Sequence, residues 1–255
     1  MLAFLKHPLT RNLDIDDPNT TLLRRQIIQQ KPFLRKIYED WYTWVASSIP
    51  HGKGKVLELG SGAGFLEKFV PGPITTEVFY CPLVSMIMDG CFMPFPDGLF
   101  KAIVLVNVFH HIPMAELFLK EAVRCLRPGG KILLVEPWVT TWSFFVYAYL
   151  HHEPFDVRTQ SWSFSTTGPL SGSNHALPWI VFERDRRIFE FTFQQLAIDK
   201  ITVEKPFVYL FSGGVSLRSL MPEFSYGYFR TMEDLFKPWM HKLGMFAKIE
   251  LSRKE

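Results

Sequence analysis

The chain has 255 residues, 28 Lys plus Arg against 25 Asp plus Glu, and a net charge of +3. With 47% hydrophobic and 21% charged residues it can bury a sizeable core, which excludes a disordered protein. Its basic residues are spread along the chain, whereas nucleic-acid-binding proteins usually carry a basic stripe with interleaved aromatic residues. We therefore expect no nucleic-acid partner.

Cysteine usage and apolar runs bear on the compartment. The three cysteines, Cys81, Cys91 and Cys125, lack metal-ligand spacing and predict reduced thiols. The apolar run near the first residue is too short for a signal peptide, and the most lipid-like segment, residues 142–150, is too short to span a bilayer. These features predict a cytoplasmic protein with no stable membrane insertion.

In chain order, an irregular leader is followed by two helices, beginning near Asn19 and at Pro32, whose apolar residues recur at helical spacing. Buried β-type runs then predict strands at 55–59, 74–79, 84–88, 102–108 and 131–136, with helices at 65–70 and 114–126. Strands that alternate with helices predict a parallel sheet with right-handed crossovers.

The alternation lapses after Pro137. Residues 138–180 form a long segment of the kind that usually serves as a lid or binding insertion. Beyond it we predict a helix at 181–195, a strand at 198–211, a second insertion at 212–232, a helix at 233–243 and a last strand at 245–252. We expect one domain over residues 1–255, with an N-terminal helical cap at 1–53, a cofactor-binding core at 54–137, and the two insertions on the substrate side.

A glycine loop follows the first predicted strand. Gly60, Gly62 and Gly64 lie between a strand and a helical segment, where glycine lets backbone approach a ligand closely. A dinucleotide loop would place its third glycine at position 65, which is Phe65. The spacing favours a ligand without a pyrophosphate over NAD or FAD. A tight turn without a ligand is the alternative.

Polar residues follow the next three strands, at the edge where parallel sheets bind ligands. Glu77 is placed to accept both hydroxyls of a ribose, unless it is an ordinary surface charge. Asp89 is placed to accept a hydrogen bond from an adenine amine, with Phe92 and Met93 flanking the base. Asn107 is placed to hold a charged amino-acid group.

Four motifs together resemble the class I S-adenosylmethionine-dependent methyltransferases, most closely the branch that includes the ubiquinone/menaquinone-biosynthesis C-methyltransferases. They are ELGSGAG at 58–64, MPFPD at 93–97 after Asp89, NVFHHIP at 107–113 and LRPGG at 126–130. The resemblance implies an α/β fold with a Rossmann-like doubly wound sheet of order 3-2-1-4-5-7-6, strand seven antiparallel.

The resemblance also implies S-adenosylmethionine as cofactor. It places Glu58, Gly60 and Gly62 by the methionine group, Glu77 by the ribose and Asp89 by the adenine. The complete set of predicted cofactor-binding residues is Glu58, Gly60, Ser61, Gly62, Gly64, Glu77, Asp89, Gly90, Cys91 and Asn107.

Methyl transfer from an activated cofactor chiefly needs alignment and the exclusion of water, and a base only where the acceptor carries a weakly acidic proton. Candidate catalytic residues are His110 and His111, after the fourth strand, and His152, in the His151-His152-Glu153 run. His175 is a further histidine of the first insertion. His152 and Glu153 are of types that bind metals, but adjacent side chains point apart and no further ligand has clear spacing, so no metal is predicted.

The insertions carry many aromatic residues, which either close an apolar chamber over the acceptor or pack the insertions onto the sheet. These are Trp138, Trp142, Phe155, Trp162, Trp179, Tyr209 and Tyr226. Arg184-Asp185-Arg186 is either a solvated charge cluster or a site that binds an acidic group of the acceptor. Ser212-Gly213-Gly214 is a plain turn or a close-approach loop.

The sequence thus predicts an S-adenosylmethionine-dependent methyltransferase that acts on a small, partly apolar acceptor. Two alternatives stay open: a non-catalytic binding protein with a methyltransferase-like fold and, less favoured, an NAD-type oxidoreductase.

Overall fold

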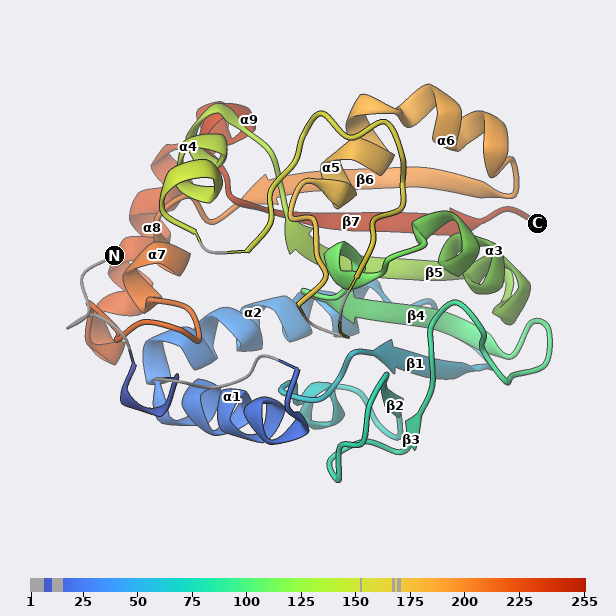
Figure 1. Cartoon of the computed structure of the whole chain (residues 1–255), viewed down its shortest axis with the longest axis horizontal. Coiled ribbons are helices and arrows are strands. Elements are labelled where there is room, and N and C mark those ends of the chain that lie inside the picture. The colour runs from blue at the N-terminus through green and yellow to red at the C-terminus, as the bar shows by residue number, and fades with distance from the viewer. Residues whose placement is uncertain (1–6, 11–15, 152, 167, 169–170) are drawn as a thin grey trace.

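A seven-stranded sheet of order β3-β2-β1-β4-β5-β7-β6 forms the centre of the computed structural model, which describes residues 7–10, 16–151, 153–166, 168 and 171–255 (Figure 1). β7 runs antiparallel to both of its neighbours, and the other pairs are parallel. The predicted strand order and fold class are confirmed. The strands are β1 (Lys55–Leu59), β2 (Ile74–Glu77), β3 (Met86–Ile87), β4 (Phe100–Val106), β5 (Leu126–Pro137), β6 (Leu196–Glu204) and β7 (Phe246–Arg253).

Helices flank both faces of this sheet. Those of α type are α1 (Pro18–Gln30), α2 (Pro32–Ser48), α3 (Ala115–Cys125), α4 (Thr141–Tyr149), α5 (Leu177–Trp179), α6 (Arg186–Thr192), α7 (Val208–Ser212), α8 (Tyr226–Leu235) and α9 (Met240–Leu243). Short turns of 3-10 type are η2 (Pro8–Thr10), η3 (Leu66–Lys68), η4 (Phe109–His111), η6 (Glu223–Ser225) and η7 (Lys237–Trp239), and η5 (Ile180–Arg184) is a π-helical turn. α1 begins where Asp17 caps the backbone N–H of Asn19 and Pro18 occupies the first turn.

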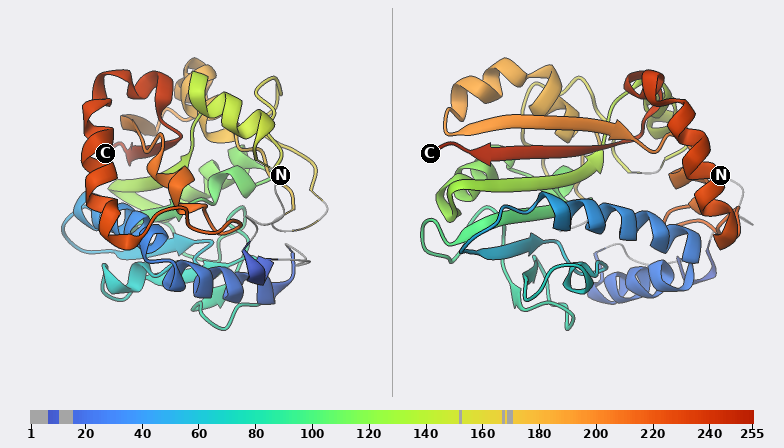
Figure 2. Two further views of the ribbon diagram at one scale, coloured as in Figure 1. Left: turned by 90° about the vertical axis from the view of Figure 1, so that its left-hand side faces the viewer. Right: turned by 180° about the vertical axis from the view of Figure 1, so that it is seen from behind.

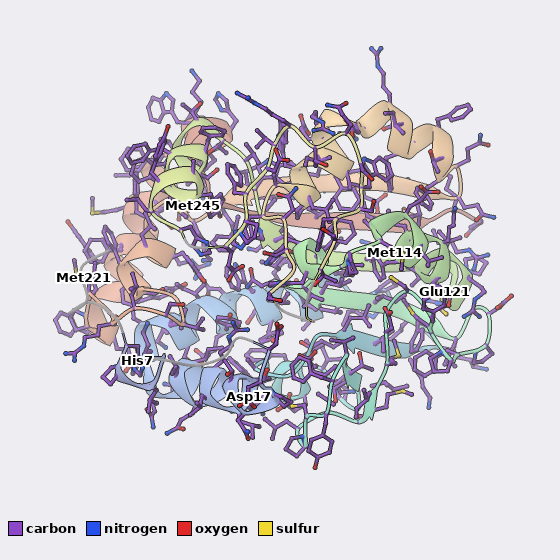
Figure 3. All side chains as sticks on the ribbon, in the orientation of Figure 1. His7, Asp17, Met114, Glu121, Met221 and Met245 are labelled. Carbon is purple, nitrogen blue, oxygen red and sulfur yellow. The ribbon has the colours of Figure 1, made fainter. Side chains whose placement is uncertain are left out.

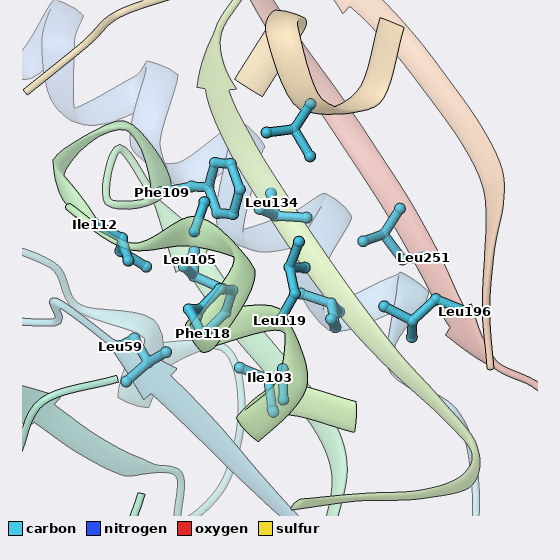
Figure 4. Packing of buried hydrophobic residues seen from close by; sticks show 14 of the residues in the cluster. Leu59, Ile103, Leu105, Phe109, Ile112, Phe118, Leu119, Leu134, Leu196 and Leu251 are labelled. Carbon is cyan, nitrogen blue, oxygen red and sulfur yellow. The ribbon is translucent and has the colours of Figure 1, made fainter. Parts of the chain in front are cut away.

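The central strands are apolar on both faces because successive side chains alternate between two helical layers. On one face, Leu105 and Leu134 pack against Phe118 and Leu119 of α3 (Figure 4). α2 crosses the opposite face, as the view from behind shows (Figure 2). Full burial of a side chain such as Phe118 contributes about 1.5–3 kcal/mol relative to leaving it exposed. Two well-packed layers therefore hold the sheet as a rigid platform.

Several predicted elements differ from the structure. The helix expected at 65–70 is the single turn η3, because the chain breaks at Pro71-Gly72-Pro73. The strand expected at 198–211 ends at Glu204, where Lys205 has a φ of +54° and Pro206 follows, and the chain continues into α7. The helix expected at 181–195 is η5 followed by α6, and that at 233–243 is divided among α8, η7 and α9.

Within the described part of the chain, none of the helices combines the length and apolar character needed to cross a bilayer.

Candidate functional site

A cavity of about 980 Å³ lies at the carboxyl ends of β1, β2 and β4. This is the edge of a parallel sheet at which ligands bind, and the volume is at the upper end of small-molecule pockets. Its wall combines α1, α2, the glycine loop, the loop after β4 and parts of both insertions. Figure 3 labels Met245, one of the wall residues, whose backbone carbonyl accepts a hydrogen bond from Tyr147 of α4.

The glycine loop packs too tightly for any side chain. Gly60 has a φ of +60°, and a Cβ there would lie 2.4 Å from Cγ2 of Val108. A Cβ on Gly64 would lie 2.2 Å from the Tyr42 hydroxyl. Both glycines belong to the cavity wall. Ser61 and Gly62 lie behind it: Ser61 donates to the carboxylate of Glu58.

Two buried carboxyl groups face the cavity from β1 and β2. Burial raises the pKa of Glu58 to about 8. Glu77 accepts the backbone N–H of Gly62 at 3.2 Å and that of Val78 at 3.1 Å, and burial raises its pKa. The energetic cost of ionising these groups inside the protein falls when a cation or hydroxyl donors bind beside them.

Asp89 and Gly90 lie at another part of the wall, after β3. Asp89 accepts the backbone N–H of Cys91 at 2.8 Å. Cys91 itself is buried behind the wall, with Sγ 3.7 Å from the Met114 carbonyl oxygen. The loop thus presents the Asp89 carboxylate and not the Cys91 thiol.

The apolar wall near Asp89 differs from the prediction. Met88, Val78 and Ile112 line the cavity, in place of Phe92 and Met93. Phe92 is 63% exposed, and Met93 is buried in the core beneath α3. The sequence motif located the carboxylate but not the apolar surface beside it.

Asn107 follows β4 and adopts the left-handed region, with a φ of +57° that is uncommon outside glycine. Its backbone N–H still donates to Val135 at 2.8 Å, so the strain is confined to the turn. The turn places Asn107, Val108 and His110 on the cavity wall.

His110 is held by a buried carboxylate that sequence reasoning missed. Its Nδ1 lies 2.6 Å from Oε2 of Glu136, at the end of β5. Oε1 of Glu136 accepts the backbone N–H groups of Val108 and Phe109, each at 2.8 Å. Burial raises the pKa of Glu136 to about 7, while these hydrogen bonds oppose the rise, and burial lowers the pKa of His110. His110 is therefore neutral and fixed in orientation.

His111, Glu153 and His175 complete a cluster around His110. Oε2 of Glu153 lies 2.5 Å from Nε2 of His175 and 3.9 Å from Nε2 of both His110 and His111. Burial lowers the pKa of His111 to about 3. Burial acts to raise the pKa of Glu153, but its bond to His175 and the neighbouring imidazoles lower it well below the usual value. His152 lies outside the described residues, so its catalytic role stays a prediction.

Asn174 joins two separate segments of the first insertion. Its side-chain oxygen accepts the backbone N–H of Asp156 at 3.0 Å, and its amide nitrogen donates to the Asp156 carbonyl at 2.9 Å. Its own backbone N–H donates to the His110 carbonyl at 2.9 Å. Asn174 therefore connects the segments that carry Glu153 and His175 to the loop after β4.

The second insertion reaches the cavity through Gly213 and Gly214, whose φ angles are +69° and +51°. Lys31, between α1 and α2, donates to the carbonyls of Gly214 and Leu217, the latter at 2.8 Å. Burial lowers the pKa of Lys31 to about 8. The backbone of this loop thus forms part of the cavity wall, and the loop is not a plain surface turn.

Most of the predicted chamber aromatics pack the insertions onto the sheet: Trp138, Trp162 and Trp179 belong to one core, Trp142, Phe155 and Tyr226 to the other. Tyr209 lines the cavity, as do tyrosines that the prediction did not include, namely Tyr38, Tyr42, Tyr147 and Tyr149. Arg184 pairs with Asp185 at 2.8 Å and donates to the Val157 carbonyl, so it stabilises the first insertion from outside the cavity wall.

The sheet order, the antiparallel β7 and a cavity at the ends of β1, β2 and β4 define the class I methyltransferase fold. Residues 74–134 match the model of a methyltransferase domain family. The resemblance to class I S-adenosylmethionine-dependent methyltransferases is therefore confirmed for the fold and for residues 74–134. The ubiquinone/menaquinone branch stays a prediction.

Two similar solved structures span nearly the whole chain. One is a chain of the complex between the Haloferax volcanii Trm112 methyltransferase activator and the putative methyltransferase, with 12% identity, a TM-score of 0.53, and 95% of this chain and 98% of that chain covered. The other is geranyl diphosphate C-methyltransferase from Streptomyces coelicolor A3(2), with 12% identity, a TM-score of 0.51, and 98% and 87% covered. At these identities they show a shared fold. No curated protein matches the chain.

Proposed function

We propose that the protein is an S-adenosylmethionine-dependent methyltransferase whose acceptor is a small, partly apolar molecule. The observation that carries the proposal is one continuous cavity, which joins the glycine loop and its acidic residues to the cluster of His110, His111 and Glu153. A volume of about 980 Å³ has room for a nucleoside cofactor and a second small molecule.

The residues on the cofactor side fit this cofactor chemically. Gly60 and Gly64 keep the backbone free of side chains, Glu58 and Asn107 lie where the amino-acid group would bind, Glu77 suits the ribose hydroxyls and Asp89 the adenine amine. When bound, the cofactor supplies a methyl group already activated by a positively charged sulfur. Ser61, Gly62, Gly90 and Cys91 would then shape the loops that carry these contacts.

The acceptor would enter between the loop after β4 and the two insertions. Leu150, Leu210 and Tyr209 supply an apolar wall, and His110 and His111 supply polar contacts next to Asn107. These residues would orient the acceptor and exclude water, the main contribution a protein makes to methyl transfer. The solved Streptomyces coelicolor structure holds geranyl-S-thiolodiphosphate, a small partly apolar molecule, on the same fold. We also propose that residues 138–180 and 212–232 are substrate-side insertions of a single domain.

Isothermal titration of the full chain with S-adenosylhomocysteine, S-adenosylmethionine and NAD tests the cofactor. We expect one molecule of either sulfur compound per chain and no binding of NAD. Glu77→Ala should weaken binding at least about tenfold, because one lost charge-assisted hydrogen bond is worth about 1.5–3 kcal/mol. The control is Glu116→Ala, in an exposed pair with Lys120. NAD binding without binding of either sulfur compound would overturn the proposal.

Transfer itself needs a second readout. The protein is incubated with methyl-labelled cofactor and a fraction of small apolar and amphipathic metabolites, and labelled products are separated. Labelled product that disappears in Glu77→Ala supports an enzyme. Cofactor binding without labelled product across such fractions favours the non-catalytic binding protein.

A further inference from the structure

Two imidazole rings and one carboxylate converge on a single point beside the loop after β4. The ligand atoms of His110, His111 and Glu153 all lie within 4.8 Å of one another. The first two come from the turn η4 and the third from the first insertion, far along the chain. Three side chains of the types that bind transition metals have thus been gathered by the fold.

Hydrogen bonds on the far side of each ring determine which atoms face this point. Nδ1 of His110 is bonded to Glu136 at 2.6 Å, and Nδ1 of His111 to the Gly172 carbonyl oxygen at 3.2 Å. A carbonyl oxygen can only accept, so the His111 proton is on Nδ1. Oε1 of Glu136 already accepts two backbone N–H groups, and its Oε2 is placed to accept the proton of Nδ1 of His110 in the same way. Each Nε2 therefore presents a lone pair.

Both Nε2 atoms lie 3.9 Å from Oε2 of Glu153, and in this tautomer neither carries a proton to donate to it. The distances exceed those of a hydrogen bond. Three electron-rich atoms this close together repel one another, and a cation between them would replace the repulsion by attraction.

We propose that His110, His111 and Glu153 bind a zinc ion, through Nε2 of each histidine and an oxygen of the carboxylate. Tetrahedral zinc with bonds of about 2.0–2.2 Å holds its ligand atoms about 3.3–3.5 Å apart. A shift of the Glu153 carboxylate by well under 1 Å would shorten the 3.9 Å distances between its Oε2 and the two Nε2 atoms to that value.

The surroundings are those of a metal site. Histidine ligands usually donate their other ring N–H to a carboxylate or a backbone carbonyl, as His110 does to Glu136 and His111 to Gly172. The Glu153 carboxylate is held by His175 at 2.5 Å. A second possible set, His151, Glu153 and His175, shares the same carboxylate. The first set is favoured because both of its rings have this outer support, whereas Nδ1 of His175 is buried without a hydrogen-bond partner among the described residues.

Three protein ligands leave one position of the ion open, as in catalytic zinc sites. That position faces the cavity, because the side chains of His111 and Glu153 keep 14% and 18% of their surface exposed. Resting on the proposed function, this open position would bind an oxygen of the acceptor, which makes molecules with a hydroxyl or carbonyl oxygen the expected class. Zinc binding itself does not depend on methyl transfer.

Titration of the chelator-treated full chain with Zn²⁺ tests the site directly, and Co²⁺ serves as a spectroscopic substitute. We expect one zinc ion per chain and tetrahedral-type visible absorption of bound Co²⁺. His111→Ala and Glu153→Gln should each weaken zinc binding by at least about 100-fold, and Glu136→Gln, which changes only the outer support, by about 10–100-fold. Matched controls are His241→Ala, at an exposed residue of α9, and Glu190→Gln, in an exposed pair with Arg186.

Thermal unfolding and S-adenosylhomocysteine binding are recorded for every variant. A variant that keeps both but loses zinc supports the site. If Glu153→Gln fails to fold, His111→Ala with its retained cofactor binding decides the matter. Absence of stoichiometric zinc binding, or binding that is equally tight in His111→Ala and the controls, overturns the proposal. Failure of cofactor binding in the wild-type chain would refute the proposed function and leave the zinc result standing.

Discussion

Oε2 of Glu136, at the end of β5, lies 2.6 Å from Nδ1 of His110, in the turn after the neighbouring strand β4. The glutamate is fully buried and its other oxygen holds two backbone N–H groups of the same turn. One carboxylate therefore fixes both the backbone of the turn and the tautomer of the histidine.

Replacing this carboxylate should alter the tautomer of His110. In Glu136→Gln the amide oxygen can still accept from Val108 and Phe109, but the NH₂ group then faces Nδ1, so we expect the ring proton to move to Nε2. Long-range ¹H–¹⁵N spectra report the tautomer. The free energy of unfolding should fall by about 1–3 kcal/mol, the cost of weakening a buried charge-assisted bond. An unchanged Nδ1–H tautomer in the folded variant would show that Glu136 does not orient the ring.

Gly60 and Gly72 form a matched pair, because both have a φ close to +60° but only one lacks space for a side chain. Alanine in the left-handed region costs about 1–2 kcal/mol at either position. Gly60→Ala should cost about a further 1–3 kcal/mol, since its Cβ would lie 2.4 Å from Val108 Cγ2, whereas the position at Gly72 has nothing within 4 Å. Urea denaturation measures both. Val108→Ala in the Gly60→Ala background should recover most of the extra loss, and failure to recover any of it would exclude the contact as the cause.

The residues on the cofactor side of the site could be predicted from the sequence because that side is built from short contiguous motifs. Glu58 and Glu77 lie at the ends of β1 and β2 and Asp89 follows β3, and the parallel sheet brings these strand ends to one edge. Glu136 was missed although it also ends a strand. A carboxylate at the end of an apolar run can be read from the sequence as a candidate site residue. Its pairing with His110 cannot, because that histidine lies in another segment.

The acceptor side of the site could not be predicted from the sequence, because its residues come together through long-range contacts. Glu153 and His175 meet because Asn174 pairs with Asp156, a long-range contact with no periodic pattern to reveal it. The Trp residues of the insertions could have packed in the core or lined the cavity, since composition does not determine which way a side chain points. The strand predicted through residue 211 was too long because apolar runs fit strand and helix equally.

Asn174 should control the position of Glu153. Asn174→Ala removes both side-chain bonds to Asp156, and we expect a loss of about 2 kcal/mol in unfolding free energy for two part-buried hydrogen bonds. Hydrogen exchange should accelerate in peptides covering 153–157 and 172–177, while peptides from β4 and β5 stay protected. The control is Ser219→Ala, in the other insertion, where one exposed hydroxyl bonds to Met221. Equal hydrogen exchange in Asn174→Ala and wild type would show that Asn174 does not hold the segment that carries Glu153.

Glu58 should make stability depend on pH. Burial raises its folded-state pKa from 4.5 to about 8. Below about pH 4.5 both states are protonated; between about 4.5 and about 8 the unfolded chain releases the proton and the folded one retains it. The contribution of Glu58 to stability is therefore complete at acidic pH and is lost as pH rises to about 8. Glu58→Gln removes the proton exchange while keeping a hydrogen-bonding side chain of the same shape.

Urea denaturation of both proteins across this range measures the effect as the difference between them, which cancels the other buried carboxyls. The wild type should lose several kcal/mol relative to Glu58→Gln between about pH 5 and about pH 8, since each pKa unit corresponds to about 1.4 kcal/mol. Glu116→Gln, with a side chain 53% exposed, should follow the wild type. Saturating S-adenosylhomocysteine should flatten the slope, because its ammonium group beside Glu58 would stabilise the carboxylate. A difference that stays constant with pH would show that Glu58 ionises normally in the fold.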